Sequence, residues 1–182
     1  MSLEVIMGSM FSGKSTELIR RIRLQQVMGR NVRVVNHALD DRKGCLESVR
    51  THDATEFRAV KYPTLEPFMF NDVDTVAVDE TQFFGGLRGW VEMGLAMGKH
   101  IILAGLDGDF KQQRFGELLD VLPLADNVTK LRALCMFCRD GTPGPFTYRN
   151  PGVGQGEQVL VAAEDCYKAV CRKCLTEPRS QT

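Results

Sequence analysis

The sequence has no surplus of charge of either sign and no long apolar run. Among its 182 residues, 23 Lys and Arg side chains balance 23 Asp and Glu side chains, so the formal net charge is zero. A general nucleic-acid-binding protein usually carries a basic excess, so the balance favours a small substrate. The apolar runs are far too short to cross a bilayer. We therefore expect no nucleic-acid partner and no membrane span.

A secretory signal pattern is also missing from the N-terminus, where the apolar residues 3–7 predict a short buried strand instead. The expected location is therefore cytoplasmic, in a reducing compartment. In such a compartment, clustered cysteines indicate a metal site or a catalytic site before they indicate disulfides.

Two C-x-x-C pairs form the clearest metal-binding pattern of the chain. The pairs are Cys135 with Cys138 and Cys171 with Cys174. Four thiolates in two such pairs suit a closed, tetrahedral and structural zinc site, which leaves no open position for catalysis. Two disulfides, or four unrelated core cysteines, are the alternatives.

A glycine-rich motif follows the predicted N-terminal strand. Its pattern, G-x-x-x-x-G-K-S, is typical of a loop whose backbone N–H groups cradle phosphates, and a helix with an apolar face is predicted directly after it, over 16–24. The lysine can reach the β- and γ-phosphates, and the serine hydroxyl can bind Mg²⁺. The alternative is a glycine turn before an ordinary helix. The candidate phosphate-binding residues are Gly8, Ser9, Met10, Phe11, Ser12, Gly13, Lys14 and Ser15.

Apolar strands alternate with helices over the first 134 residues. Further strands are predicted at 32–35, 74–80, 100–105 and 128–134, helices at 87–97 and 115–122, and a polar loop at 36–53. This order predicts an α/β fold with a parallel sheet flanked by helices, as in P-loop NTPases. In such sheets, ligands bind beyond the carboxyl ends of the strands, where the glycine-rich loop should lie.

The composition changes near Cys135. Residues 141–145 and 150–156 are rich in turn-forming Gly, Pro and Asn. A tail of this size cannot form a large core alone, so it needs a staple such as a metal. The sequence therefore predicts a nucleotide-binding domain over 1–134 and a small zinc-binding subdomain with the C-terminal tail over 135–182.

Two carboxylates follow one of the predicted buried strands. In a chain with a phosphate loop, Asp79 is suited to hold Mg²⁺ directly or through water, and Glu80 is suited to accept a proton from an attacking hydroxyl. The alternative is a pair of solvated carboxylates at a strand end. Aromatic residues follow the same strands, among them Phe83, Phe110 and Phe115. Most of them are expected in the core, and stacking on a planar base stays open.

Taken in order, these motifs resemble the type II thymidine kinases of cells and large DNA viruses over nearly the whole chain. The stretch 8–21, GSMFSGKSTELIRR, is similar to the phosphate loop and helix of that family. Residues 79–84, DETQFF, resemble its D-E-x-Q-F-F signature, and residues 106–110, LDGDF, resemble its L-D-G-x-F segment. The two cysteine pairs, with Tyr167 before the second, resemble its zinc-anchored lasso, which closes over the nucleoside base.

The resemblance implies transfer of the γ-phosphoryl group of ATP to the 5′-hydroxyl of thymidine, with Mg²⁺ and a structural Zn²⁺, by a homotetramer. It implies that Glu80 is the catalytic base. It implies an ATP and Mg²⁺ site that comprises the phosphate loop with Asp40, Arg42, Asp79 and Gln82. It implies a substrate site made of Phe83, Leu106, Phe110, Phe115, Gln158, Val159, Leu160, Val161, Ala162 and Tyr167. The implied zinc ligands are Cys135, Cys138, Cys171 and Cys174.

The sequence departs from the family pattern at several positions. Ser9 stands where proline is common, and Val161-Ala162-Ala163 replaces a usual isoleucine-glycine-glycine. The alanines should alter the path of the lasso if the glycines serve a close backbone approach or a positive φ. A zinc-containing ATP-dependent DNA-processing module is the main competing interpretation, and a nucleotide-gated regulatory switch is a third. The neutral net charge disfavours the DNA-processing module.

Overall fold

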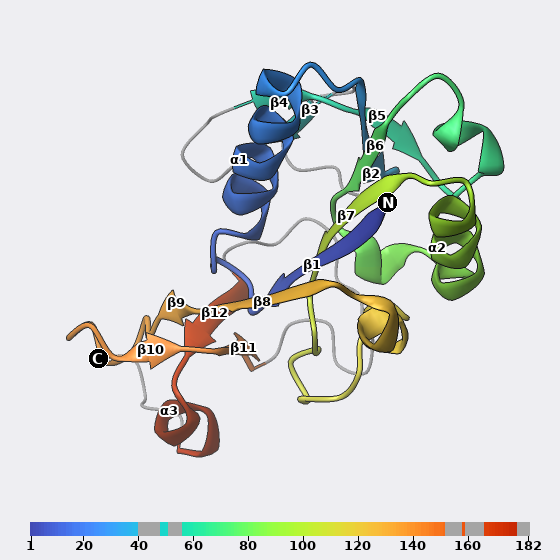
Figure 1. The fold of residues 1–182 in the computed structure, drawn as a ribbon. Coiled ribbons are helices and arrows are strands. Elements are labelled where there is room, and N and C mark those ends of the chain that lie inside the picture. The colour runs from blue at the N-terminus through green and yellow to red at the C-terminus, as the bar shows by residue number, and fades with distance from the viewer. Residues whose placement is uncertain (40–47, 51–55, 152–157, 159–165, 178–182) are drawn as a thin grey trace.

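The predicted parallel sheet is present. The computed structural model describes residues 1–39, 48–50, 56–151, 158 and 166–177, with the backbone alone for 48–50 and 56–58. Six parallel strands form one sheet in the order β5-β2-β6-β7-β1-β8 (Figure 1). In chain order these strands are β1 (Ser2–Gly8), β2 (Val32–His37), β5 (Val60–Tyr62), β6 (Thr75–Val78), β7 (His100–Gly105) and β8 (Asn127–Leu131).

Helices cover both faces of this sheet, as the near-continuous apolar strands predict. Successive strand residues alternate between the faces, so Ile101 and Leu103 pack in one apolar cluster and Ile102 in the other. The first cluster includes Trp90 of α2 (Leu87–Ala96), and the second includes Ile22 of α1 (Lys14–Val27). The two helices therefore lie on opposite sides of the sheet (Figure 1).

The parallel arrangement brings several strand ends together at one edge. Val5 of β1 and Val78 of β6 both align with Leu103 of the central strand β7. The chain therefore leaves β1 at Gly8, and β6 just before Asp79, at the same edge of the sheet. We call this the carboxyl edge, and it is the place where a sheet of this kind binds ligands.

Two predicted elements differ in the structure. Residues 115–122 do not form an α-helix, and a 3₁₀-helix, η4 (Leu118–Leu124), stands there and includes Pro123. Gly116 is in the left-handed conformation, with φ of +62°, so an α-helix cannot run through the start of this stretch, and Pro123 disfavours the α conformation of Leu122 at its end. The predicted strand over 128–134 is split, because the chain leaves β8 and enters β9 (Ala133–Leu134) of another sheet.

Shorter elements complete the sheet domain. Within the polar stretch after β2, the predicted loop contains a strand, β3 (Ser48–Arg50), which pairs antiparallel with β4 (Glu56–Arg58). The 3₁₀-helices η2 (Pro67–Phe70) and η3 (Thr81–Phe83) precede and follow β6. Within the described parts of the chain, no helix combines the length and apolar character needed to span a membrane.

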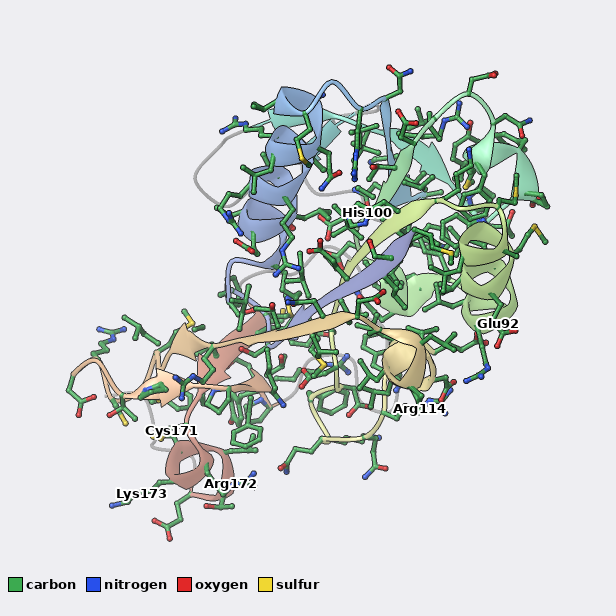
Figure 2. All side chains as sticks on the ribbon, viewed as in Figure 1. Glu92, His100, Arg114, Cys171, Arg172 and Lys173 are labelled. Atoms are coloured by element: carbon green, nitrogen blue, oxygen red, sulfur yellow. The ribbon has the colours of Figure 1, made fainter. Side chains whose placement is uncertain are left out.

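The remaining elements build a small second body that we call the cysteine lobe. It comprises β9, β10 (Pro143–Gly144), β11 (Phe146–Arg149), β12 (Tyr167–Val170) and α3 (Arg172–Thr176). Its two short sheets pair β9 with β10 and β11 with β12, all antiparallel. Figure 2 shows Cys171, Arg172 and Lys173 of this lobe at the end of the molecule away from Glu92 of α2.

Candidate functional site

The glycine-rich loop occupies the carboxyl edge between β1 and α1. Gly8 has φ of +154°, and a Cβ at this position would lie 2.4 Å from the carbonyl oxygen of Leu131, so only glycine fits. Gly13 adopts a left-handed conformation, with φ of +82°, immediately before α1 begins at Lys14. The loop therefore has the strand–loop–helix context that its motif requires, with the N–H groups of a helix start available to an anion.

Four polar side chains lie within and beside this loop. Lys14 is buried, and its Nζ donates to the Ser9 carbonyl oxygen across the loop at 2.8 Å. The Ser15 hydroxyl donates to Asp79 Oδ2 at 2.7 Å, which joins the start of α1 to the end of β6. Among the described residues, the buried Ser12 Oγ has no hydrogen-bond partner. A buried hydroxyl without a partner fits a ligand oxygen, so the loop suits a phosphate group.

Glu80 holds an unusual backbone conformation beside Asp79. Its φ of +51° is in the left-handed region, which is uncommon for residues other than glycine and often marks functional sites. The Gln82 amide donates to Glu80 Oε2 at 2.5 Å and accepts a hydrogen bond from the backbone N–H of Leu106 at 2.9 Å. Gln82 therefore fixes the Glu80 carboxylate relative to the end of β7.

Aromatic side chains lie next to these carboxylates. The rings of Phe83 and Phe115 meet edge to face, with centroids 5.6 Å apart. The ring of His37, at the end of β2, lies 5.5 Å from the ring of Phe83. Phe115 is buried and Phe83 is partly exposed, so Phe83 is the member of the pair that presents surface to a ligand.

A second aromatic cluster joins the sheet domain to the cysteine lobe around Arg149. Its guanidinium lies 3.8 Å from the ring centroid of Phe110 and donates to the Tyr167 hydroxyl, at 2.5 Å from its nearer nitrogen. It also donates to the Gln158 carbonyl oxygen at 3.1 Å, and the Gln158 amide donates to Asp109 Oδ2 at 2.9 Å. The structure therefore brings three predicted substrate residues, Phe110, Gln158 and Tyr167, into one network.

Arg149 and Asp109 were not among the predicted site residues. Arg149 is a single arginine in a turn-rich stretch, and no spacing marks it as functional. Asp109 stands inside the L-D-G-D-F segment, so that motif was a usable signal for it. Both residues are only 8% exposed, so each needs hydrogen-bond partners, because a buried charge without partners is costly.

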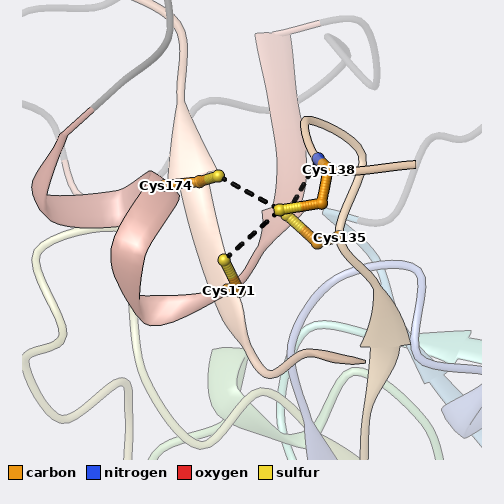
Figure 3. Close-up of side chains that lie close together, drawn as sticks. All are labelled: Cys135, Cys138, Cys171 and Cys174. Atoms are coloured by element: carbon orange, nitrogen blue, oxygen red, sulfur yellow. Dashed lines mark hydrogen bonds between the residues drawn. The ribbon is translucent and has the colours of Figure 1, made fainter. Parts of the chain in front are cut away.

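The four predicted zinc ligands form one cluster (Figure 3). The sulfur of Cys138 lies 3.8 Å from that of Cys171 and 3.5 Å from that of Cys174, and the Cys138 N–H donates to the Cys135 sulfur at 3.5 Å. All four sulfur atoms lie within 4.8 Å of one another. Tetrahedral zinc with Zn–S bonds of about 2.3 Å separates its sulfur ligands by about 3.8 Å, so the cluster fits this ion.

The thiols differ in the protonation state that their surroundings favour. Burial opposes ionisation of Cys135, but hydrogen bonds from the backbone N–H groups of Cys138, Cys171 and Phe137 bring its pKa down to about 6. Burial and the neighbouring thiols raise the pKa of Cys174 to about 12. Four thiolates can therefore share this space only around a cation, and coordination to zinc deprotonates thiols outright.

Several predicted site residues lie outside the described residues. They are Asp40 and Arg42 of the ATP and Mg²⁺ set, and Val159, Leu160, Val161 and Ala162 of the lasso. Of the other substrate residues, Leu106 stands directly after β7 and contacts Gln82 through its backbone N–H.

Three comparisons with known proteins bear on the chain. The family model for thymidine kinase matches residues 1–175. A thymidine kinase of Oryza sativa subsp. japonica is 39% identical over 180 residues, which cover 94% of this chain and 65% of the rice protein. A thymidine kinase of Myxoma virus (strain Uriarra) is 39% identical over 176 residues, with 94% of both chains covered. A solved DNA replication initiation factor aligns with 71% of this chain and 40% of its own, with a TM-score of 0.44 and 15% identity, a likeness too slight to carry an argument.

Proposed function

The chain belongs to the thymidine kinase family, and we propose that its carboxyl edge transfers the γ-phosphoryl group of ATP to the 5′-hydroxyl of thymidine with Glu80 as the general base. In this reaction a bond forms between the 5′-oxygen and the γ-phosphorus while the bond from that phosphorus to the β,γ-bridging oxygen breaks. ADP leaves with the electron pair, and Glu80 takes the hydroxyl proton. The competing DNA-processing interpretation is not favoured, because the family match accounts for the phosphate loop and the cysteines together.

The ATP end of the site is assigned to the phosphate loop and Asp79. Backbone N–H groups of residues 8–15 would hold the phosphates, and the Lys14 ammonium would leave the Ser9 carbonyl for a phosphate oxygen. When bound, Mg²⁺ neutralises charge on the phosphates. The hydrogen bond from Ser15 to Asp79 supports the Mg²⁺ assignment, because both oxygens already point to one place and hard cations take oxygen ligands. Asp40 and Arg42 stay predicted members of this set.

Glu80 is proposed as the base for a geometric reason. Glu80 directly follows Asp79, whose carboxylate accepts hydrogen bonds from the Ser15 hydroxyl and the Glu80 backbone N–H, and Gln82 holds one Glu80 carboxylate oxygen at 2.5 Å. A general base must reach the proton that it accepts, and a held carboxylate loses less entropy when the hydroxyl arrives.

The nucleoside end is assigned to the aromatic side chains and the cysteine lobe. Phe83 would form one wall against the sheet domain, backed by Phe115. Phe110 and Tyr167 would form the other, and Arg149 would hold these two rings relative to each other. The lasso residues 159–162 stay predicted contacts for the base edge. Flat walls suit a planar base, because stacking is strong and tolerant of small lateral shifts.

The cofactors and the assembly follow from the same observations. The sulfur cluster supports one structural zinc per chain, and free thiols are maintained in a reducing compartment, so we propose that the enzyme works in the cytoplasm. A homotetramer, implied by the family resemblance, is a further proposal that the molar mass in solution would test.

The observation that carries the proposal is the left-handed Glu80, anchored by Gln82 next to the Ser15–Asp79 pair. Glu80→Gln preserves the size of the side chain and removes its ability to accept a proton. Loss of a general base typically slows catalysis by about a hundredfold to ten-thousandfold. We expect that decrease in the single-turnover rate of thymidine phosphorylation at saturating ATP, with nucleotide affinity changed by less than about threefold.

The matched control is Glu92→Gln on the exposed surface of α2, where Glu92 pairs with Arg88. This control should leave the rate unchanged. A Glu80→Gln enzyme that turns over as fast as the Glu92→Gln enzyme would remove Glu80 from the role of base.

A further inference from the structure

The cysteine lobe contacts the phosphate loop directly. The Ser9 hydroxyl donates to the carbonyl oxygen of Gly144 at 3.0 Å, and the backbone N–H of Met10 donates to the hydroxyl of Thr147 at 3.1 Å. Ser9 is 2% exposed and Thr147 is 5% exposed, so water cannot readily replace either hydrogen bond if it is lost. Two neighbouring loop residues are therefore tied to two strands of the lobe, β10 and β11.

The lobe partners are themselves tied to the cysteine cluster. Gly144 pairs with Ala133 on the strand just before Cys135, and a Cβ on Gly144 would lie 3.0 Å from the backbone nitrogen of Cys135. Thr147 pairs with Ala169 in β12, a strand that ends one residue before Cys171. The Ser9–Gly144 contact therefore lies within a few residues of the first C-x-x-C pair, and the Met10–Thr147 contact lies within a few residues of the second.

Among the described residues, the apolar core of the lobe is small. Its cluster has three buried members, Cys135, Val170 and Cys174, with six partly buried residues packed against them, and two of the three belong to the sulfur cluster. In a body with so small an apolar core, the metal is expected to supply much of the order, because its binding free energy becomes folding free energy. The positions of Gly144 and Thr147 should therefore depend on whether the four sulfurs are joined.

We propose that the metal-loaded cysteine lobe is a working part of the ATP site: it positions the outer arm of the phosphate loop through Ser9–Gly144 and Met10–Thr147. Ser9 and Thr147 are then positioning residues. This inference rests on the proposed phosphate-loop and zinc assignments. Its thermodynamic consequence is reciprocal, because a metal that tightens nucleotide binding must be held more tightly, by the same factor, when nucleotide is bound.

The expected size of this coupling follows from the two hydrogen bonds that carry it. One buried neutral hydrogen bond corresponds to roughly a threefold to tenfold change in an equilibrium constant. We expect zinc to raise the affinity for a non-hydrolysable ATP analogue with Mg²⁺ by at least that factor. We expect the analogue to raise zinc affinity by the same factor, measured by competition with a zinc chelator on the full chain.

The test uses Ser9→Ala and Thr147→Val, which each remove one contact and keep nearly the same shape. In both variants, the factor by which zinc raises the affinity for the ATP analogue should fall toward one. Ser9→Thr restores a hydroxyl and should recover it. Thr142→Ala is the matched control, because Thr142 lies in the same lobe and its hydroxyl donates to Asp140. That control should keep the coupling of the parent chain.

The outcomes separate the inference from the function on which it rests. A parent chain that binds both zinc and the analogue without coupling overturns the inference and leaves the kinase assignment in place. The same holds if Ser9→Ala and Thr147→Val keep the full coupling. A parent chain that binds no zinc, or no nucleotide, overturns the assignments themselves and the inference with them.

Discussion

The carboxyl edge of the sheet and the cysteine lobe position their side chains by different physical means. Among the described residues, the sheet domain contains apolar clusters of 15 and nine buried residues, which fix the strands and with them the places of Gly8, Asp79 and Glu80. Over the same described residues, the cluster of the lobe has three buried members, two of them cysteines, so we propose that metal binding at the sulfurs supplies much of its order. The comparison predicts that a substitution at the carboxyl edge lowers the rate of phosphoryl transfer and leaves the fold intact. A substitution at the cysteines should instead disorder the cysteine lobe.

We expect the largest effect from Lys14→Ala at the carboxyl edge. It removes the cation placed where charge accumulates in the transition state, and loss of one such group costs on the order of a hundredfold to a thousandfold in rate. We expect that decrease in kcat/KM for ATP, with an unchanged thermal midpoint and little change in thymidine affinity. Lys99→Ala, which removes a contact to the Val73 carbonyl, is the control. Full ATP use by Lys14→Ala would mean that this is not a working phosphate loop.

Cys171→Ser tests whether the cysteine lobe depends on its metal site for order. Changes to groups that merely orient metal ligands cost about tenfold to a hundredfold in metal affinity, so loss of a ligand should cost at least a hundredfold. We expect substoichiometric zinc and faster limited proteolysis in the lobe, while the sheet keeps its cooperative unfolding. Cys166→Ser is the control, because Cys166 is not a member of the sulfur cluster. A metal-free preparation with an ordered lobe and full activity would refute the structural role of zinc.

Arg149→Met should produce a smaller effect at the boundary of the two regions. Methionine fills much of the space of the arginine stem but removes the bonds to the Tyr167 hydroxyl and the Gln158 carbonyl. Hydrogen bonds from a charged group are worth about 1.5–3 kcal/mol, part of which a rearranged pocket regains. We expect KM for thymidine to rise by about tenfold, with kcat changed much less.

Arg172→Met is the matched control for that change, because Arg172 stacks on Phe146, at 4.3 Å from its ring centroid, on the exposed side of the lobe. It should leave KM for thymidine as it was. If kcat falls at Arg149→Met while KM does not change, Arg149 acts on the chemical step and its assignment to the nucleoside wall is wrong.

The two regions also differ in how far the sequence predicts them. Apolar strands alternating with helices predict a parallel sheet whose carboxyl ends meet at one edge, so the approach of Ser15 to Asp79 was predictable. The sulfur cluster was predictable from its spacing. The position of Arg149 on Phe110 and the contact from Ser9 to Gly144 were not predictable, because no motif, spacing or apolar pattern marks these residues as partners.

The central claim is that the edge performs the chemistry while the lobe helps to select thymidine. Thymine offers O4 as an acceptor and N3–H as a donor, whereas cytosine reverses both. A closed pocket that fits thymine then faces two unsatisfied pairs with cytosine, at roughly 1–3 kcal/mol each. Deoxyuridine lacks only the methyl group, which is worth about tenfold.

The most direct test is to compare kcat/KM for thymidine, deoxyuridine and deoxycytidine on one preparation in which zinc has been quantified. The account predicts thymidine first, deoxyuridine about tenfold lower, and deoxycytidine on the order of a hundredfold lower or more. Deoxycytidine used as well as thymidine, by a chain that holds its zinc, would contradict it.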